Sequence, residues 1–261
     1  MSVYAKDNPK WFEEAIISIT NQTVNPSQTV IVVDGQITEE LELILEKYKK
    51  QIDILRLEKN SGLGIALRKG LEICKYPLVA RMDSDDISLH DRFEKQLNVF
   101  QKNKNLSIVG GYIQEVDCDI KKNIAVRKVP LTDSEIKQYI KIRTPFNHPT
   151  VMFKKDAVVK AGSYQDFYFM EDYYLWVRMV AHNFAMANLP EILVNMRVNS
   201  NLYARRGGYK YFKSNKAIYD EMLKLGLINY PFYLFNIAVR FSTQVLIPNK
   251  LRKIFYKKVL R

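Results

Sequence analysis

Short apolar runs alternate with stretches of helical spacing through the first hundred residues, and this order limits the possible folds. Residues 29–34 form a continuous β-branched run, and residues 52–57 and 77–82 form two more strand-like runs. Runs that are apolar throughout are typical of strands buried on both faces of a parallel sheet. Between them apolar residues recur at i, i+3, i+4 and i+7, as in residues 12–19. Strands separated by helices predict an α/β protein with a doubly wound, mostly parallel, Rossmann-like sheet.

The second half of the chain follows a looser pattern. Strands are predicted over residues 107–116 and 148–153, the first of them interrupted by Gly110-Gly111. A capping box, Thr132-Asp-Ser-Glu135, predicts a helix that reaches about residue 142. A further helix is predicted to begin at Glu171 and end near residue 183, and its inward-facing candidates are Leu175, Met179 and His182.

The composition excludes several classes of protein. With 47% hydrophobic and 26% charged residues, the chain can build a packed core, so it is neither disordered nor fibrous. Its 261 residues allow one large domain, or one domain with an appendage. Two cysteines exclude a disulfide framework and a cysteine-based zinc site, and the three histidines lie far apart. Because Met1 opens directly onto Ser-Val-Tyr without a secretory signal, a cytoplasmic location is expected.

The net charge of +12 is concentrated towards the C-terminus. No acidic residue follows Glu221, whereas residues 222–261 contain eight basic residues. A protein that binds nucleic acid through a uniformly basic surface would not show this distribution, so no nucleic-acid partner is expected. The chain therefore consists of a nearly neutral body and a basic C-terminal end.

Acidic residues stand at the ends of two predicted strands. Asp34 ends the first run, and Asp83, Asp85 and Asp86 follow the third. In open α/β sheets, ligands bind at the carboxyl ends of the strands. Carboxylates this close raise one another's pKa values unless a cation is bound, and oxygen ligands suit Mg²⁺ or Mn²⁺. The pattern favours a divalent-metal site, the alternative being that these aspartates only cap the next helix.

Three other motifs are ambiguous from the residues alone. Asn60-Ser-Gly62-Leu-Gly64 is either a phosphate-cradling turn or a plain tight turn. Glu171-Asp172 opens a predicted helix, where acids also interact favourably with the helix dipole. Arg205-Arg206 precedes two glycines, and this pair is either a diphosphate clamp or solvated surface.

Taken together, four motifs resemble those of the family 2 glycosyltransferases, which have the GT-A fold. In family order they are Val32-Val-Asp34, Asn60-x-Gly-x-Gly64, Met82-Asp-Ser-Asp-Asp86 and Glu171-Asp172-x-x-Leu-Trp176. The similarity covers about residues 1–210, the implied nucleotide-sugar transferase domain, and leaves residues 211–261 as a helical, basic extension. More narrowly, Pro145-Phe-Asn-His-Pro-Thr150 and Tyr203-Ala-Arg-Arg-Gly-Gly208 are similar to segments of bacterial transferases of capsule and exopolysaccharide biosynthesis.

The resemblance implies a donor site for a nucleotide-diphosphate sugar, with UDP as the expected nucleotide. On this basis Asp34 contacts the uracil or ribose, and Asp83 lies against the ribose and the donor. Asp85, with Asp86, holds Mg²⁺ or Mn²⁺ on the diphosphate, as in a DxD motif. The other residues expected around the donor are Tyr4, Asn60, Gly62, Arg205 and Arg206.

The resemblance also implies an inverting transfer of a hexose to a growing, lipid-linked surface polysaccharide. Asp172, with Glu171 beside it, is the implied general base, which takes the proton from an acceptor hydroxyl as its oxygen attacks C1 of the sugar. Trp176 is expected to pack within the protein and not to stack on a sugar. The family has several apolar residues before Ser-Val-Tyr4, so the first strand is expected to be short here, through a late start codon or a shortened chain.

The C-terminal end suggests contact with a membrane surface. Residues 230–247 are apolar and aromatic, but Arg240 stands near their middle. An arginine at the centre of a bilayer costs roughly 2.5–3.5 kcal/mol, which argues against a membrane span. A helix in the membrane interface, followed by the basic residues 250–261, predicts a peripheral protein on the inner face of the cytoplasmic membrane. The alternative is a helical hairpin that packs on the core, with Pro248-Asn249 as its turn.

Two other functions explain part of the sequence. A non-catalytic module that binds membranes or nucleic acid would account for the basic end, but it leaves the acidic strand ends without a purpose. A haloacid-dehalogenase-type phosphatase also uses a strand that ends in Asp-x-Asp. Here, however, Ile87 replaces its usual Thr or Val, and Asp83 comes too late in the chain.

Overall fold

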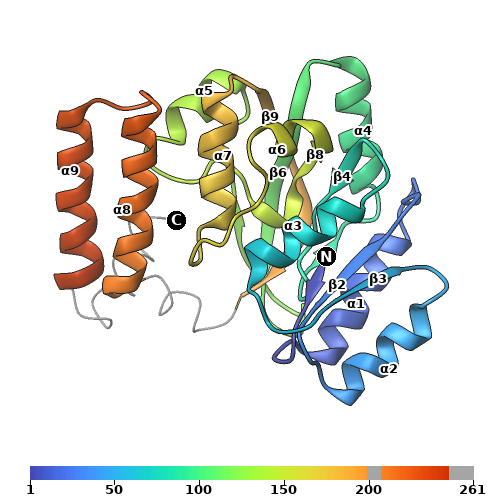
Figure 1. Ribbon diagram of the computed structural model, residues 1–261. Coiled ribbons are helices and arrows are strands. Elements are labelled where there is room, and N and C mark those ends of the chain that lie inside the picture. Colours follow the sequence, from blue (N-terminus) through green and yellow to red (C-terminus); the bar gives the residue numbers. More distant parts are fainter. Residues whose placement is uncertain (199–206, 247–261) are drawn as a thin grey trace.

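The structure, a computed structural model, describes residues 1–198 and 207–246 (Figure 1). Its first sheet is parallel and has the strand order β1-β2-β3. The strands are β1 (Ser2–Val3), β2 (Val30–Asp34) and β3 (Asp53–Leu57). β2 and β3 coincide with the predicted runs 29–34 and 52–57, and helices connect the three strands in the predicted βαβ order. The third predicted run, residues 77–82, instead contains β4, which belongs to a second sheet and pairs antiparallel with β8 (Met152–Lys154).

Three helices pack against this sheet: α1 (Pro9–Thr20), α2 (Glu39–Tyr48) and α3 (Leu63–Ile73). α1 begins after Asn8, whose side chain accepts a hydrogen bond from the backbone N–H of Trp11 at 3.2 Å, as is usual for an N-cap. The buried residues of α1 are Phe12, Ala15, Ile16 and Ile19, the four with helical spacing. Hydrophobic periodicity thus correctly identified the face that packs on the sheet.

The second sheet has the strand order β4-β8-β6-β9-β5, and β7 pairs with β6. β6 and β9 run parallel, and the other neighbours in this sheet are antiparallel. Its strands are β4 (Leu78–Ala80), β5 (Ile87–Ser88), β6 (Leu106–Val116), β7 (Asn123–Arg127), β8 (Met152–Lys154) and β9 (Ala185–Arg197). The helices along this part of the chain are α4 (Arg92–Lys102), α5 (Asp133–Tyr139), α6 (Lys155–Lys160) and α7 (Glu171–Ala181).

Some predicted details in this half were wrong. A 3₁₀ turn at His148–Thr150 occupies the start of the strand predicted from residue 148, so β8 begins only at Met152. Gly110-Gly111 does not interrupt β6, because both glycines pair with β9. A Cβ atom on Gly110 would lie 2.3 Å from Oδ1 of Asn188, so glycine there permits close packing. His182 is exposed, because α7 ends before it and the chain turns away.

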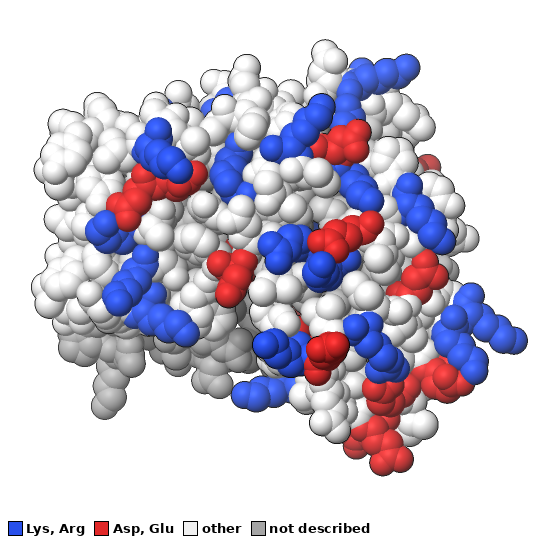
Figure 2. Space-filling model, viewed as in Figure 1, with Lys and Arg blue, Asp and Glu red and all other residues white. Residues whose placement is uncertain are grey.

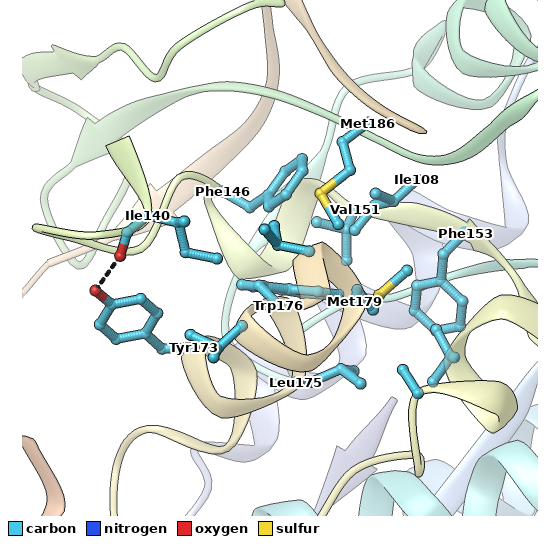
Figure 3. Packing of buried hydrophobic residues seen from close by; sticks show 14 of the residues in the cluster. Ile108, Ile140, Phe146, Val151, Phe153, Tyr173, Leu175, Trp176, Met179 and Met186 are labelled. Atoms are coloured by element: carbon cyan, nitrogen blue, oxygen red, sulfur yellow. Dashed lines mark hydrogen bonds between the residues drawn. The ribbon is translucent and has the colours of Figure 1, made fainter. Parts of the chain in front are cut away.

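The largest hydrophobic core surrounds α7 (Figure 3). Trp176 is fully buried, and its ring lies 5.4 Å, centroid to centroid, from that of Phe146. The hydroxyl of Tyr173 donates a hydrogen bond to the carbonyl of Ile140 at 2.5 Å, which joins α7 to the end of α5 (Figure 3). Trp176 therefore packs in the core, as predicted.

A helical hairpin of α8 (Tyr209–Lys224) and α9 (Tyr230–Phe241) stands beside α7 at one end of the molecule (Figure 1). Ile218, Tyr219 and Met222 of α8 belong to the same core as Trp176. A π-helical turn, Ser242–Leu246, follows α9. The hairpin is thus packed on the body, and the turn proposed at Pro248-Asn249 lies outside the described residues. Within those residues, no helix combines the length and hydropathy that a membrane crossing requires.

Strand β1 is short, as expected. The carbonyl of Met1 still accepts a hydrogen bond from the backbone N–H of Val32 at 3.0 Å. Burial lowers the pKa of the Met1 α-amino group to about 6. Beside it lies a largely apolar cavity of about 300 Å³, bordered by residues of β2, such as Val30, and by Leu78 of β4.

Candidate active site

The first motif residues come together at the carboxyl end of β2. Asp34 is buried, and its Oδ1 and Oδ2 atoms accept hydrogen bonds from the backbone N–H groups of Ser61 (2.7 Å) and Gly62 (3.0 Å). Nδ2 of Asn60 donates to the carbonyl of Asp34 at 3.3 Å. Gly62 has a φ of +87°, a conformation that favours glycine. The structure therefore brings Asp34, Asn60 and Gly62 into one turn, in which Asp34 holds the backbone.

The aspartates after β4 form a compact acidic cluster. Carboxylate oxygens of Asp83, Asp85 and Asp86 all lie within 4.8 Å of one another. Burial, with Asp83 nearby, raises the pKa of Asp85 to about 6, and burial with Asp85 beside it raises that of Asp86 well above its usual range. Burial and the neighbouring carboxylates thus both disfavour the charged forms of Asp85 and Asp86.

Basic side chains hold this cluster in place without neutralising it. Arg81 forms an ion pair with Asp83, and the backbone N–H of Arg197 donates to Oδ1 of Asp86 at 2.9 Å. The Arg197 guanidinium donates to the carbonyl of Asp85 at 2.5 Å and pairs with Glu14. Neither arginine was predicted. Arg81 stands only two residues before Asp83 in the sequence, whereas Arg197 comes from the end of β9, which pairs with β5 just after the cluster.

Asp7 is a further acid that the sequence analysis missed. Its Oδ2 accepts hydrogen bonds from the Ser84 hydroxyl at 2.8 Å and from the backbone N–H of Tyr4 at 3.1 Å. Burial raises the pKa of Asp7 to about 6, and its charge also raises that of Asp85. Asp7 follows β1 at the same sheet edge as Asp34, so the strand-end rule could have found it had β1 been long enough to recognise. Tyr4, a predicted donor residue, is 37% exposed beside it.

The acidic cluster has the properties of a divalent-metal site. It offers oxygen ligands from three side chains within 4.8 Å, the donor type that Mg²⁺ and Mn²⁺ prefer. Besides burial, repulsion from neighbouring aspartates raises the pKa values of Asp85 and Asp86, and a bound cation would offset that repulsion. Asp83, Asp85 and Asp86 therefore fit the metal that the sequence predicted.

The second predicted pair of acids lies at the N-terminus of α7. A Cβ atom on Gly64 would lie 2.1 Å from the carbonyl oxygen of Gln165 and 3.3 Å from Cβ of Glu171, so α3 and α7 meet closely here. Burial, with Asp172 adjacent, raises the pKa of Glu171 to about 7. The buried Tyr164 has a raised pKa to which the charges of Asp172 and Asp83 both contribute, so both acidic groups lie near this ring.

Asp172 also lines a cavity of about 270 Å³ between the body and the α8–α9 hairpin. Phe146, Asn147 and His148 form part of its wall. Nε2 of His148 lies 3.0 Å from the Tyr164 hydroxyl. Asp172 and the Pro145-Phe-Asn-His-Pro-Thr150 segment therefore border the same cavity. The predicted Arg205 and Arg206 lie outside the described residues.

The sequence comparison with known families decides the class of the chain. Residues 1–162 match the sequence model described as "Glycosyl transferase family 2". The chain belongs to this family. It is therefore a glycosyltransferase, and the phosphatase and the non-catalytic module no longer need to be considered.

Two relatives of this family 2 transferase match it over nearly its whole length. The first is the Escherichia coli protein named UDP-Gal:alpha-D-GlcNAc-diphosphoundecaprenol beta-1,3-galactosyltransferase. It is 37% identical over 263 residues, which cover 100% of this chain and 95% of the relative. The amylovoran biosynthesis glycosyltransferase AmsE of Erwinia amylovora is also 37% identical over 263 residues, which cover 99% of this chain and 97% of AmsE. The similarity therefore includes the α8–α9 hairpin.

Solved structures confirm the GT-A fold of the transferase. S. aureus TarS 1–349, in complex with UDP-GlcNAc, has a TM-score of 0.70 at 16% identity, over 99% of this chain and 75% of TarS 1–349. The mannosyltransferase PcManGT from Pyrobaculum calidifontis, in complex with GDP-Man and Mn²⁺, has a TM-score of 0.64 at 13% identity, over 97% of this chain and 71% of PcManGT. At these identities the likeness concerns the fold alone.

Proposed function

We propose that this family 2 transferase moves a hexose from a UDP-sugar to a hydroxyl of a lipid-linked acceptor during the synthesis of a bacterial surface polysaccharide, with inversion at the sugar carbon. The observation that carries the proposal is the cluster of Asp83, Asp85 and Asp86 after β4, whose carboxylate oxygens lie within 4.8 Å of one another. A second acidic pair, Glu171-Asp172, begins α7, and Asp172 lines a cavity. The names of the Escherichia coli and Erwinia amylovora relatives support the choice of donor and pathway.

The donor occupies the carboxyl edge of the first sheet in this proposal. Asp34 fixes the turn of Asn60 and Gly62, which then borders the nucleoside together with Tyr4. Asp85 and Asp86, with Asp83, would hold Mg²⁺ or Mn²⁺ against the diphosphate, where the ion offsets charge on the leaving group. Arg205 and Arg206 keep their proposed place over the diphosphate.

Asp172 acts as the general base on the opposite side. It lines the cavity at the N-terminus of α7, where an acceptor hydroxyl can reach its carboxylate. The carboxylate takes the proton from this hydroxyl while the oxygen forms its bond to C1 and the bond from C1 to the diphosphate breaks. Glu171 is buried beside it with a pKa of about 7. We assign Glu171 the role of orienting Asp172, and residues 1–210 the role of the transferase domain.

We further propose that the transferase works at the inner face of the cytoplasmic membrane. One face of α9, comprising Tyr230, Leu234, Phe235 and Val239, is apolar and exposed, and Phe235 is 68% exposed. These residues recur at i, i+4, i+5 and i+9, and the outer edge of the molecule along α9 is free of charged side chains in Figure 2. The sequence that follows is basic, which suits an anionic lipid surface.

Calorimetry with nucleotides tests the proposed donor site. UDP should bind the full chain in the presence of Mn²⁺ and much more weakly without it, whereas GDP and ADP should bind weakly in both cases. Asp85→Asn should reduce Mn²⁺-dependent UDP affinity by about 100-fold or more, because a metal contact contributes several kcal/mol. Asp91→Asn, which changes an aspartate that immediately precedes α4 and whose side chain is 44% exposed, is the matched control. Equal UDP binding with and without Mn²⁺ would contradict the assignment of the acidic cluster.

A further inference from the structure

The cavity beside Asp172 has walls that the proposed donor chemistry does not use. The Pro145-Phe-Asn-His-Pro-Thr150 segment contributes Phe146, Asn147 and His148 to one side. Tyr211 and Asn215 of α8 contribute to the other. The volume of about 270 Å³ is close to the lower end of the range for small-molecule sites, roughly 300–1,000 Å³. The hairpin therefore completes a space large enough for a small polar group next to the general base.

Three elements far apart in the sequence each place an arginine on this cavity. Arg127 ends β7, Arg143 follows α5, and Arg240 belongs to α9. Nη2 of Arg240 donates to the carbonyl of Ile142 at 2.5 Å, which brings α9 against the segment that carries Arg143. Among the described residues lining the cavity, Asp172 is the single acid. The cavity therefore has a positive lining, and guanidinium groups bind phosphate oxygens in a two-pronged geometry.

Asn147 fixes one wall of the cavity. It is 1% exposed, and its Nδ2 donates to the carbonyls of Gly111 (2.9 Å) and Arg127 (3.2 Å). Asn147 thereby ties the segment that precedes the turn at His148 to β6 and to the end of β7, where Arg127 stands.

The mouth of the cavity is apolar. Ile142 and Phe169 line it and are 55% and 50% exposed. Arg240, which also lines it, belongs to α9, the helix that carries the exposed apolar face. A ligand that combines a hydroxyl, phosphate and hydrocarbon would match this combination of a carboxylate, arginines and exposed apolar residues on one cavity.

We propose that this cavity is the acceptor subsite, and that Arg127, Arg143 and Arg240 bind the diphosphate that links the acceptor sugar to its lipid. The sugar hydroxyl points to Asp172, which lines the same cavity. The hydrocarbon chain leaves over Ile142 and Phe169. This inference rests on the proposed function, which supplies the lipid-linked acceptor.

Binding of a lipid diphosphate without a sugar tests this subsite directly. The full chain is first saturated with UDP and Mg²⁺ so that the donor site is occupied. It is then titrated with a short-chain prenyl diphosphate, with the same prenyl alcohol, and with inorganic pyrophosphate. The prenyl diphosphate should bind at least tenfold more tightly than either of the other two, because only it meets both the arginines and the apolar rim.

Substitution of one arginine locates the binding. Arg143→Gln should weaken prenyl diphosphate binding by about 10- to 100-fold, the range for a lost charged hydrogen bond, while UDP affinity stays unchanged. Arg143→Lys should recover part of the loss. Arg56→Gln is the matched control, because Arg56 lies on β3 of the first sheet and pairs with Glu42 of α2. Arg127→Gln gives an independent second variant.

The outcomes separate this inference from the proposed function. Two outcomes would contradict the subsite while leaving the donor site intact, provided that UDP binds. In the first, the prenyl diphosphate binds no more tightly than the prenyl alcohol. In the second, it binds Arg143→Gln and Arg127→Gln as tightly as it binds the wild type. Pyrophosphate binding as tightly as the prenyl compound would overturn the lipid part of the inference. If UDP itself fails to bind, both the proposed function and the inference fail.

Discussion

The two sides of the candidate active site carry opposite charge and come from different parts of the sequence. On the donor side, Asp83, Asp85 and Asp86 lie within four residues of one loop. On the acceptor side, three arginines from β7, from the segment after α5 and from α9 line one cavity. The aspartates of one short loop are enough to hold a metal. A site that binds phosphate through arginines needs, in this protein, segments that only tertiary packing brings together.

This difference gives the transferase a way to tell two diphosphates apart. In the proposed function, the donor diphosphate comes with a divalent metal and suits carboxylates, and the acceptor diphosphate meets guanidinium groups directly. Each site is unfavourable for the wrong partner, since a metal would be repelled by the arginines and a bare diphosphate by the aspartates. Glu171 and Asp172 begin α7, and Asp172 lines the same cavity as the three arginines.

The largest expected effect comes from replacing Asp172, and it tests whether the donor and acceptor sides act independently. Asp172→Asn should lower kcat by about 10²- to 10⁴-fold, the usual contribution of a general base. UDP affinity in the presence of Mn²⁺ should change by less than about twofold, because Asp172 belongs to the acceptor side. Transfer kinetics and UDP calorimetry measure the two quantities, and Asp166→Asn, an exposed aspartate near α7, is the control. A parallel loss of UDP affinity would show that the sides act as one.

A smaller effect is expected at the outer face of α9. Leu234→Ser combined with Phe235→Ser should reduce binding to anionic phosphatidylglycerol vesicles by about 100-fold, since each buried apolar side chain contributes about 1.5 kcal/mol or more. Both side chains are at least half exposed, so the fold should remain intact. Sedimentation with vesicles measures the partitioning. Ile17→Ser with Leu43→Ser, two exposed residues on α1 and α2, is the control. Unchanged partitioning of the α9 variant would remove this helix from the membrane contact.

The donor side could be predicted from the sequence because it depends on local rules. Asp34 and the Asp83 cluster could be picked out because each follows a predicted strand, although β2 and β4 belong to different sheets and β4 pairs antiparallel with β8. The role of Asp34 in holding the turn at Gly62 needed the hydrogen bonds. Asp7 was missed because β1 has only two residues and gives no recognisable period.

The acceptor side could not be predicted, because nothing local connects its parts. From the sequence, Arg240 is a charge in the middle of an apolar segment. In the structure, its guanidinium donates to Ile142, 98 residues earlier in the chain. Asn147 and His148 were noticed as part of a family-like segment, yet their place beside Asp172 depends on the packing of α7 against the turn His148–Thr150.

The smallest expected effect concerns Glu171, on the border between the two sides. Its carboxyl has a pKa of about 7 in the folded protein because of burial and the adjacent Asp172, whereas an unfolded glutamate has a pKa near 4.3. The folded state therefore binds this proton more tightly, and this group makes the protein lose stability as the pH rises from about 4.3 to 7. Glu171→Gln removes the titration, so relative to wild type the variant should gain at most about 1.4 kcal/mol of unfolding free energy for each pH unit of that interval. Urea unfolding at several pH values, without nucleotide, measures the difference, with Glu46→Gln, an exposed glutamate on α2, as control. If unfolding free energy depends on pH in the same way for the wild type and for Glu171→Gln, Glu171 ionises near its ordinary pKa in the folded protein. The border between the donor and acceptor sides then carries two full negative charges.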